Sequence, residues 1–359
     1  MRFTVSQSAL ARTVGMVSKC VSSNESLPTL SGIYVKAEDG KVEMRATDGN
    51  VSIRRVMSAN VEESGETLLP GKTLAGIVKT LPDAAVTIEC GDSATLKCMR
   101  SRFRLNTMQS DRFPKFPDID AELSVELPGD LLSAMVDKVK KVVGKDNSRP
   151  MTMGILVSVG NGVIRMSSTD GYRLAVCDSS VDKGKEFEVV IPGIALSQAL
   201  SLGALMDVVA ISADSNLVSI EMGDVTYITR RLVGSFPNFS SVIPKSFATS
   251  VTVGSEEMTK ALKRVDVIAR QNPSIRVSVA DDMMTLFAYS QNEGESTEEI
   301  PVDVTGNPMT IGLSHKFMLD CLEAVSGDVT LEMNAAEQPA VFKQYADINY
   351  LYLLMPTRL

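Results

Sequence analysis

The chain has 359 residues, of which 44% are apolar and 22% are charged, and its formal net charge is −8. This length suggests two or three domains of roughly 150 residues each, and no segment holds the roughly 18 apolar residues that a membrane-spanning helix needs. The single histidine, His315, excludes metal sites built on paired histidines, argues against triad catalysis and is expected to be structural or solvated.

The first third of the chain predicts a helix followed by a β-hairpin. Four apolar residues recur at helical spacing: Leu10, Val14, Val17 and Val21. Two segments that alternate between apolar and polar residues, 33–36 and 42–45, flank Asp39-Gly40. An Asp-Gly pair between apolar strands is a strong hairpin signal.

A second helix is expected after Pro70-Gly71, and strand patterning returns at 94–98. The apolar face of this helix is formed by Leu74, Ile77, Val78 and Leu81. The segment Gly71-Lys72-Thr73 is not expected to be a phosphate loop. A Walker A motif needs a glycine five positions before its second glycine, and Glu66 stands there.

The middle third repeats this order of elements. Its first helix has the apolar residues Leu132, Val136, Val139 and Val143. A hairpin is expected at Asn161-Gly162, a second helix at 194–202 after Pro192-Gly193, and a strand at 217–221.

The last third is more diverged but keeps the same phase. Its helix has the apolar residues Met258, Leu262, Val265 and Ala269, and strands are expected at 275–279 and 284–288. The sequence thus predicts three similar units, each with helices packed on one side of antiparallel sheet, an α+β arrangement.

Three short motifs support the repetition, at offsets of roughly 120 residues. They are Pro-Gly at 70 and 192, Thr-Asp-Gly at 47 and 169, and Phe-Pro-x-Phe at 113 and 236. Proline-rich, aperiodic segments near 117–120 and 244–247 interrupt the patterns. We therefore expect domains at 1–121, 122–246 and 247–359.

The corresponding helix of each unit has a basic face, although the chain is acidic overall. A basic helix face can simply be solvated, but the same sign at three corresponding places favours an anionic partner. With the second helix of the first unit, the basic residues are Arg12, Lys19, Lys72, Lys79, Lys138, Lys141, Lys145, Lys260, Lys263 and Arg264.

Catalytic and metal-binding patterns are sparse. Asp48 and Asp170 lie in Thr-Asp-Gly turns, where aspartate usually hydrogen-bonds its own backbone. The five cysteines have neither metal-like nor redox spacing, so we expect reduced, mostly buried thiols in a cytosolic protein. No catalytic residue, metal or cofactor is predicted.

Several motifs together resemble the bacterial DNA sliding clamps, the beta subunits of DNA polymerase III, over the whole chain. They are the segments 1–5, 27–30, 101–103, 169–176, 236–237 and 354–359. The resemblance implies three tandem clamp domains per chain and a head-to-tail homodimer that closes as a six-domain ring. Such a ring would be a non-catalytic processivity factor that encircles double-stranded DNA without sequence preference, its basic helices facing the phosphates.

The resemblance also implies a seam between two chains, where a strand around Phe103 meets the third domain of another chain. Alternating arginines would face glutamates there, although such arginines can also simply protect a solvated edge strand. The implied seam residues are Arg102, Phe103, Arg104, Ile268, Ala269, Glu298 and Glu299.

Partner peptides of the polymerase alpha subunit, the clamp loader and other clamp-binding proteins are implied to enter an apolar pocket between the second and third domains. The matching residues are Arg149, Thr152, Thr169, Gly171, Tyr172, Arg173, Leu174, Pro237, Val242, Met355, Pro356 and Arg358. Ordinary packing in the core or in the C-terminal strand is the alternative reading of each.

The chain departs from the family pattern in a few places. Tyr172 stands where histidine is commoner, Thr357 where a large apolar residue is commoner, and Thr152 where leucine is usual. Asn24-Glu25 replace a frequent arginine in a DNA-contacting loop. Two other classes stay open at this stage: an enzyme with diverged domains, and a monomeric peptide-binding scaffold.

Overall fold

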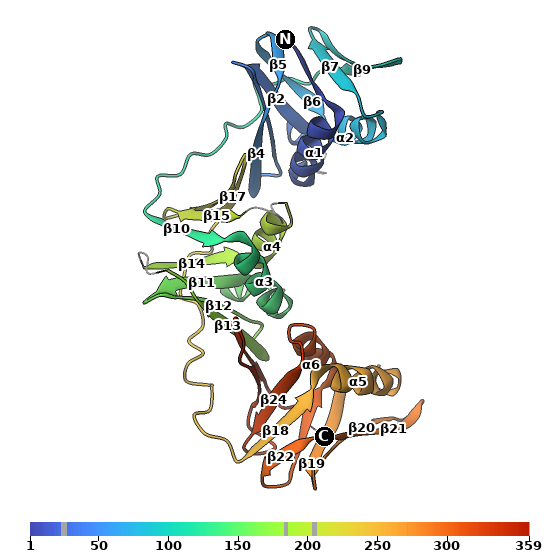
Figure 1. Cartoon of the computed structure of the whole chain (residues 1–359), viewed down its shortest axis with the longest axis vertical. Helices are drawn as coiled ribbons and strands as arrows, with labels where there is room; N and C mark the ends of the chain where they lie inside the picture. Colours follow the sequence, from blue (N-terminus) through green and yellow to red (C-terminus); the bar gives the residue numbers. More distant parts are fainter. Residues whose placement is uncertain (23–26, 183–185, 203–206, 271, 359) are drawn as a thin grey trace. The chain divides into compact units, whose positions relative to one another are not determined.

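The computed structural model describes residues 1–22, 27–182, 186–202, 207–270 and 272–358. Contacts divide the chain into two compact units, the first formed by Met1–Asp130 with Gln198–Arg231, and the second by Leu131–Ser197 with Leu232–Leu359. Each unit contains two antiparallel sheets (Figure 1). No described helix is both long enough and apolar enough to cross a membrane.

The first unit contains a five-stranded and an eight-stranded sheet. The smaller has the order β5 (Asn60–Glu63), β1 (Arg2–Ser6), β7 (Ala85–Cys90), β8 (Ser93–Cys98), β9 (Ser101–Asn106). The larger has the order β10 (Leu123–Pro128), β15 (Val208–Ala213), β16 (Leu217–Met222), β17 (Val225–Arg230), β4 (Val51–Ser58), β3 (Lys41–Thr47), β2 (Gly32–Glu38), β6 (Gly65–Pro70).

The second unit contains a nine-stranded and a four-stranded sheet. The larger has the order β14 (Phe187–Pro192), β11 (Gly154–Gly160), β12 (Val163–Thr169), β13 (Arg173–Ser180), β26 (Asn349–Leu354), β25 (Ala340–Gln344), β24 (Asp328–Met333), β18 (Thr249–Gly254), β22 (Asp303–Gly306). The smaller has the order β21 (Gly294–Pro301), β20 (Met283–Ser290), β19 (Ser274–Ala280), β23 (Met309–Ser314).

The described helices, except the last, lie where the apolar spacing predicts them. They are α1 (Gln7–Val17), α2 (Gly71–Thr80), α3 (Gly129–Val139), α4 (Gly193–Leu202), α5 (Ser255–Ala269) and α6 (His315–Leu322). Short 3-10 turns cover Ser18–Cys20, Pro28–Ser31, Lys140–Val142 and Pro150–Met153. The helix α1 packs against α2 and against β3 and β4, while α5 packs on β20 and β21 and against α6 (Figure 1).

The predicted hairpins are confirmed. Residues Asp39 and Gly40, which join β2 to β3, have φ of 50° and 72°, and Asn161 and Gly162, which join β11 to β12, have φ of 54° and 77°. Positive φ at both central residues is the type I′ geometry that matches the twist of paired strands.

The repeated Pro-Gly motif joins a strand to a helix by close packing. A Cβ atom on Gly71 would lie 2.8 Å from a methyl carbon of Val21, and one on Gly193 would lie 2.6 Å from a methyl carbon of Val143. Contacts this short would force a shift of the backbone or of the valine. The motif therefore lets α2 begin in contact with Val21 and α4 begin in contact with Val143.

Candidate functional site

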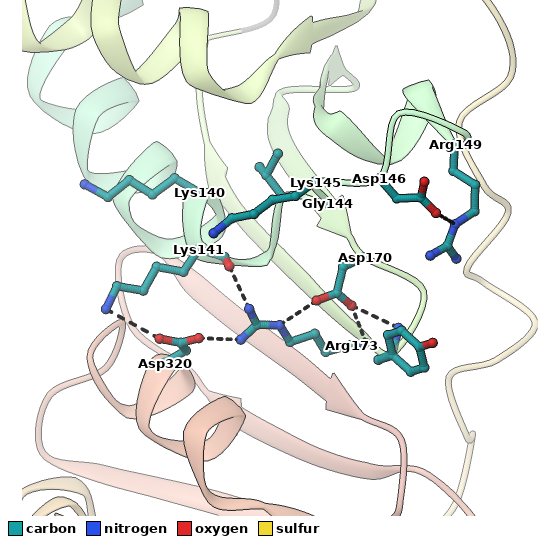
Figure 2. Close-up of a pocket in the computed structure, with 11 residues that line it drawn as sticks. Lys140, Lys141, Gly144, Lys145, Asp146, Arg149, Asp170, Arg173 and Asp320 are labelled. Carbon is teal, nitrogen blue, oxygen red and sulfur yellow. Dashed lines mark hydrogen bonds and ion pairs between the residues drawn. The ribbon is translucent and has the colours of Figure 1, made fainter. Parts of the chain in front are cut away.

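Three of the predicted pocket residues line one cavity of about 740 Å³ in the second unit: Arg149, Tyr172 and Arg173 (Figure 2). The other lining residues come mainly from the 3-10 turn after α3 and the loop that follows it, and one comes from α6: Lys140, Lys141, Val143, Gly144, Lys145, Asp146, Asp170 and Asp320. Five cations and three carboxylates thus line this cavity.

The Thr-Asp-Gly turn between β12 and β13 shapes one wall of the cavity. The Asp170 carboxylate accepts hydrogen bonds from the backbone N–H groups of Tyr172 (2.9 Å) and Arg173 (3.1 Å). This is the backbone-binding role that the sequence predicts for a turn aspartate. Gly171 has φ of +91°, and a Cβ atom there would lie 2.6 Å from an Arg149 guanidinium nitrogen. Glycine is thus favoured here for two reasons: the backbone has a positive φ, and a side chain would collide with Arg149.

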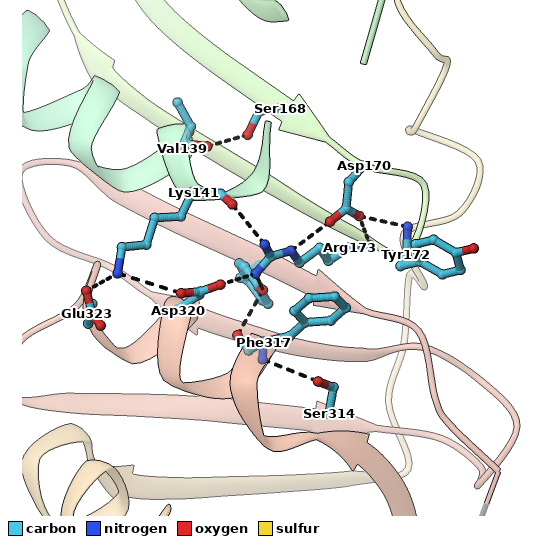
Figure 3. Close-up of polar contacts among 11 residues, drawn as sticks. Val139, Lys141, Ser168, Asp170, Tyr172, Arg173, Ser314, Phe317, Asp320 and Glu323 are labelled. Atoms are coloured by element: carbon cyan, nitrogen blue, oxygen red, sulfur yellow. Dashed lines mark hydrogen bonds and ion pairs between the residues drawn. The ribbon is translucent and has the colours of Figure 1, made fainter. Parts of the chain in front are cut away.

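Arg173 is almost fully buried beside this turn, with its side chain 8% exposed. The guanidinium donates to the carboxylates of Asp170 (2.9 Å) and Asp320 (2.6 Å). It also donates to the Tyr352 hydroxyl (3.1 Å) and the Lys141 carbonyl oxygen (2.8 Å), and it lies 4.0 Å above the Phe317 ring centre (Figure 3). Burial opposes the charge, but these partners outweigh it and raise the pKa of Arg173 further.

Two lysines expected to face an anionic partner instead contact the end of α6. Lys138 is half-buried: its ammonium donates to the carbonyl oxygen of Ala324 (2.6 Å) and lies 5.2 Å from the Tyr350 ring centre. Burial lowers the pKa of Lys138. The expectation that Lys138 projects outward is therefore wrong, because a segment distant in sequence covers it. Lys141 pairs with Glu323 and, at 3.6 Å, with Asp320, yet it stays partly exposed.

The remaining predicted basic residues have exposed side chains. They are Arg12, Lys19, Lys72, Lys79, Lys145, Lys260, Lys263 and Arg264. Arg264 on α5 makes a two-point contact with Glu298 on β21, at 2.9 and 2.6 Å. The predicted loop residues Asn24 and Glu25 lie outside the described residues.

The C-terminal residues meet the same turn. The Met355 N–H donates to the Tyr172 carbonyl oxygen (2.9 Å), and the Thr357 N–H donates to that of Gly312 (2.9 Å). Both Tyr172 and Met355 have exposed side chains, at 63% and 41%. Two apolar side chains, one from each of the paired segments, are thereby held next to solvent.

The other predicted pocket residues have varied environments. Leu174 belongs to a buried cluster with Val176, Val341 and Leu353, against which Phe239 and Ile243 pack. Thr152 and Thr169 are buried and donate to backbone carbonyl oxygens. Among the described residues, Gly171, Pro237, Val242, Met355, Pro356 and Arg358 lie outside the lining of this cavity.

Five of the seven predicted seam residues lie on two sheet edges, and the other two, Ile268 and Ala269, lie on α5. The strand β9, which carries Arg102, Phe103 and Arg104, is the last strand of its sheet, and β21, which carries Glu298 and Glu299, is the last strand of another. Ile268 is half-buried. Ala269 is only 1% exposed, so the expectation that it contributes to a contact surface is wrong: it lies on the buried face of α5. Glu298 already has a partner within the chain in Arg264.

His315 has a structural position at the start of α6. It is fully buried, and its ring nitrogens lie 2.8 Å from the carbonyl oxygen of Pro273 and 2.7 Å from the Asp266 carboxylate. Four of the five free cysteines are buried. No group of side chains suited to hold a metal ion occurs among the described residues.

Sequence patterns missed the residues that surround Arg173. Asp320 and Tyr352 lie 147 and 179 positions away in sequence, and neither belongs to a motif. The repeated turn was the only available signal, because it differs between the copies: Val51 follows the first and Arg173 follows the second.

Comparison with known proteins agrees with a chain of three similar domains. Models of the N-terminal, central and C-terminal domains of the DNA polymerase III beta subunit match residues 1–117, 126–238 and 240–358. The beta sliding clamp of Streptomyces coelicolor is 28% identical over 375 residues, covering 100% of both chains. That of Chlamydia pneumoniae is 29% identical over 365 residues, covering 100% of this chain and 99% of its own.

Solved structures show the same fold. The sliding clamp from Bacillus subtilis superimposes with a TM-score of 0.95 at 26% identity, and the beta subunit from Thermotoga maritima with 0.92 at 26%; each match covers 100% of this chain and 99% of the other. The chain has three clamp domains, each rich in sheet. It therefore belongs to the DNA polymerase III beta subunit family, the bacterial beta sliding clamps, which are non-catalytic processivity factors of DNA replication.

Proposed function

We propose that two copies of this chain close head to tail into a six-domain ring around double-stranded DNA and slide along it, tethering the replicative polymerase. The observation that carries this proposal is the match of three clamp domains along one chain, combined with exposed basic residues on α1, α2 and α5. Lysine and arginine contacts to phosphate have no sequence register, so they permit movement along the duplex. The domains would span 1–121, 122–246 and 247–359, and the protein would act in the cytoplasm.

Two sheet edges of opposite charge support a seam between chains. The edge strand β9 carries Arg102 and Arg104, and the edge strand β21 carries Glu295 and Glu299, all with exposed side chains. Strands at open edges have free backbone groups that can pair with another chain. A head-to-tail contact needs two unlike surfaces, which these edges provide. Ala269 is not part of this proposal.

The partner-binding site would lie around Tyr172, Leu174, Val242, Met355 and Arg149. The exposed apolar side chains of Tyr172, Val242 and Met355 suit an adaptable peptide surface. Sliding clamps from Pseudomonas aeruginosa and Bartonella birtlesii have been solved bound to griselimycin, which shows that clamps of this fold hold ligands. We extend the proposed site to Thr152, Thr169, Gly171, Arg173, Pro237, Pro356 and Arg358. Its partners would be peptides of the polymerase alpha subunit, the clamp loader and other clamp-binding proteins.

Retention on closed and open DNA tests the encircling function. The labelled protein is loaded by its clamp loader onto a nicked circular plasmid, and half of the sample is then linearised with a restriction enzyme. We expect the protein to remain on circles and to leave the linear molecules through their free ends. Equal loss from both forms would reject topological binding.

Mass measurement separates the ring from a monomeric scaffold. Size-exclusion chromatography with light scattering should give twice the chain mass of 38.7 kDa. A monomer at micromolar concentration would contradict the closed ring but would leave the peptide-binding site possible.

A further inference from the structure

We propose that Arg173 is a positioning residue of the partner-binding site, whose buried guanidinium holds in place the wall formed by Tyr172 and Met355. This inference rests on the proposed function of that site. It goes beyond the expectation that Arg173 lines the pocket, and it assigns a role to two residues outside the predicted site, Asp320 and the fully buried Tyr352.

The first argument is that the guanidinium is already occupied. Four of its hydrogen bonds go to Asp170, Asp320, Tyr352 and the Lys141 carbonyl oxygen, and Phe317 covers one face. An arginine has only five N–H donors. With 8% of its side chain exposed, Arg173 has little surface to offer a ligand.

The second argument comes from the first copy of the same turn, which serves as an internal control. Asp48 accepts hydrogen bonds from the N–H groups of Asn50 and Val51, both at 2.9 Å. The Thr47 hydroxyl donates to the Val51 carbonyl oxygen (2.7 Å), as the Thr169 hydroxyl does to that of Arg173 (2.8 Å). The turn thus forms equally well when valine replaces arginine. The arginine side chain must therefore serve something other than the turn itself.

The third argument is what Arg173 connects. Its backbone lies opposite Leu354 in the β13–β26 pairing, one residue before Met355. Its side chain reaches Asp320 on α6 and the Tyr352 hydroxyl, which in turn donates to the carbonyl oxygen of Phe317 (2.9 Å) (Figure 3). One guanidinium therefore fixes β13, β26 and α6 relative to one another. Because the Met355 N–H donates to the Tyr172 carbonyl oxygen, this arrangement sets how the two exposed side chains face solvent.

The test removes one buried hydroxyl that no partner can reach. Tyr352→Phe deletes the hydrogen bonds to Arg173 and Phe317 while leaving the ring, and Tyr352 is 0% exposed. Tyr350→Phe is the matched control, since it lies two residues away on the same strand and its buried hydroxyl has no hydrogen-bond partner among the described residues. Affinity for griselimycin is measured by calorimetry on the whole protein, beside the melting temperature.

We expect Tyr352→Phe to weaken griselimycin binding about two- to tenfold, the size of one net hydrogen bond, and Tyr350→Phe to leave it unchanged. Arg173→Met should weaken binding more, and adding Tyr352→Phe to it should cause little further loss, because both changes break one network. Arg173→Lys should resemble Arg173→Met, since one ammonium cannot span four partners.

A second measurement needs no ligand. The Met355 amide hydrogen should exchange faster in Tyr352→Phe than in Tyr350→Phe, because its acceptor on Tyr172 is held less firmly. Unchanged affinity and unchanged exchange in Tyr352→Phe would overturn the positioning role, as would full rescue by Arg173→Lys. If the unaltered protein fails to bind griselimycin, the proposed site is wrong, and the exchange result alone then decides whether Arg173 organises this wall.

Discussion

Leu353 offers a quantitative test of how the segment after β17 is attached to the large sheet of the second unit. Its side chain is 3% exposed, lies opposite Leu174 in the β13–β26 pairing, and belongs to the cluster on which Phe239, Ile243 and Phe247 pack. Leu353→Ala removes three buried carbon atoms at about 0.8 kcal/mol each, and the cavity left behind adds to this loss. We expect the free energy of unfolding to fall by about 3 kcal/mol.

Urea denaturation followed by circular dichroism measures the loss, and hydrogen exchange of residues 235–247 measures its local effect. Leu351→Ala is the matched control: Leu351 is on the same face of β26 but only half-buried, so about half the loss is expected. Amides in 235–247 should exchange faster in Leu353→Ala, because the surface beneath Phe239 is removed. Equal losses at the two positions, or unaltered exchange in that segment, would refute the assignment of Leu353 as its anchor.

Three further outcomes are expected. Gly306→Ala should lower the free energy of unfolding by more than about 3 kcal/mol in thermal unfolding, because φ is +104° and the new Cβ would lie against the Ala248 carbonyl oxygen. The control Gly327→Ala, at φ of +73° in open space, should cost about 1–2 kcal/mol. Similar losses in the two variants would contradict the clash. Iodoacetamide at pH 8 should modify Cys90 about a hundredfold more slowly than a free thiol, because burial raises its pKa from 9.0 to about 11 and depletes the thiolate; rapid labelling of the folded protein would contradict this. Joint replacement of Arg102 and Arg104 by glutamate should weaken self-association in sedimentation at low salt, while Arg165→Glu on β12 should not; an unchanged dimer would exclude β9 from the seam.

The periodic elements could be predicted because their signals are local. Apolar spacing located α1, α3 and α5, and the turn pairs located the β2–β3 and β11–β12 hairpins. The surroundings of the site could not be obtained in this way. Lys138 has the spacing of an outward helix residue, yet its ammonium donates a hydrogen bond to the carbonyl oxygen of Ala324, 186 positions away. Periodicity describes one helix and contains no information about a distant segment that covers it.

The candidate site shows the same limit. The positions of Thr169, Asp170 and Gly171 could be predicted from turn chemistry, because their hydrogen bonds are made within five residues of one another. The pairing of Arg173 with Asp320 depends on the return of the chain to β26 and α6, which no spacing predicts. A difference between repeats, valine in one copy and arginine in the other, is the sequence feature that could have drawn attention to it.

The two large sheets determine how this protein responds to proteolytic cleavage of its connecting segments. The strand β13 lies within the region matched by the central domain model, and its partner β26 lies within the region matched by the C-terminal one, so a ladder of backbone hydrogen bonds crosses that boundary. The same holds for β4 and β17 at the preceding boundary. A protease that nicks the connecting segments should therefore yield fragments that stay associated under native conditions. A fragment expressed alone would present a bare strand to solvent and would be prone to aggregate.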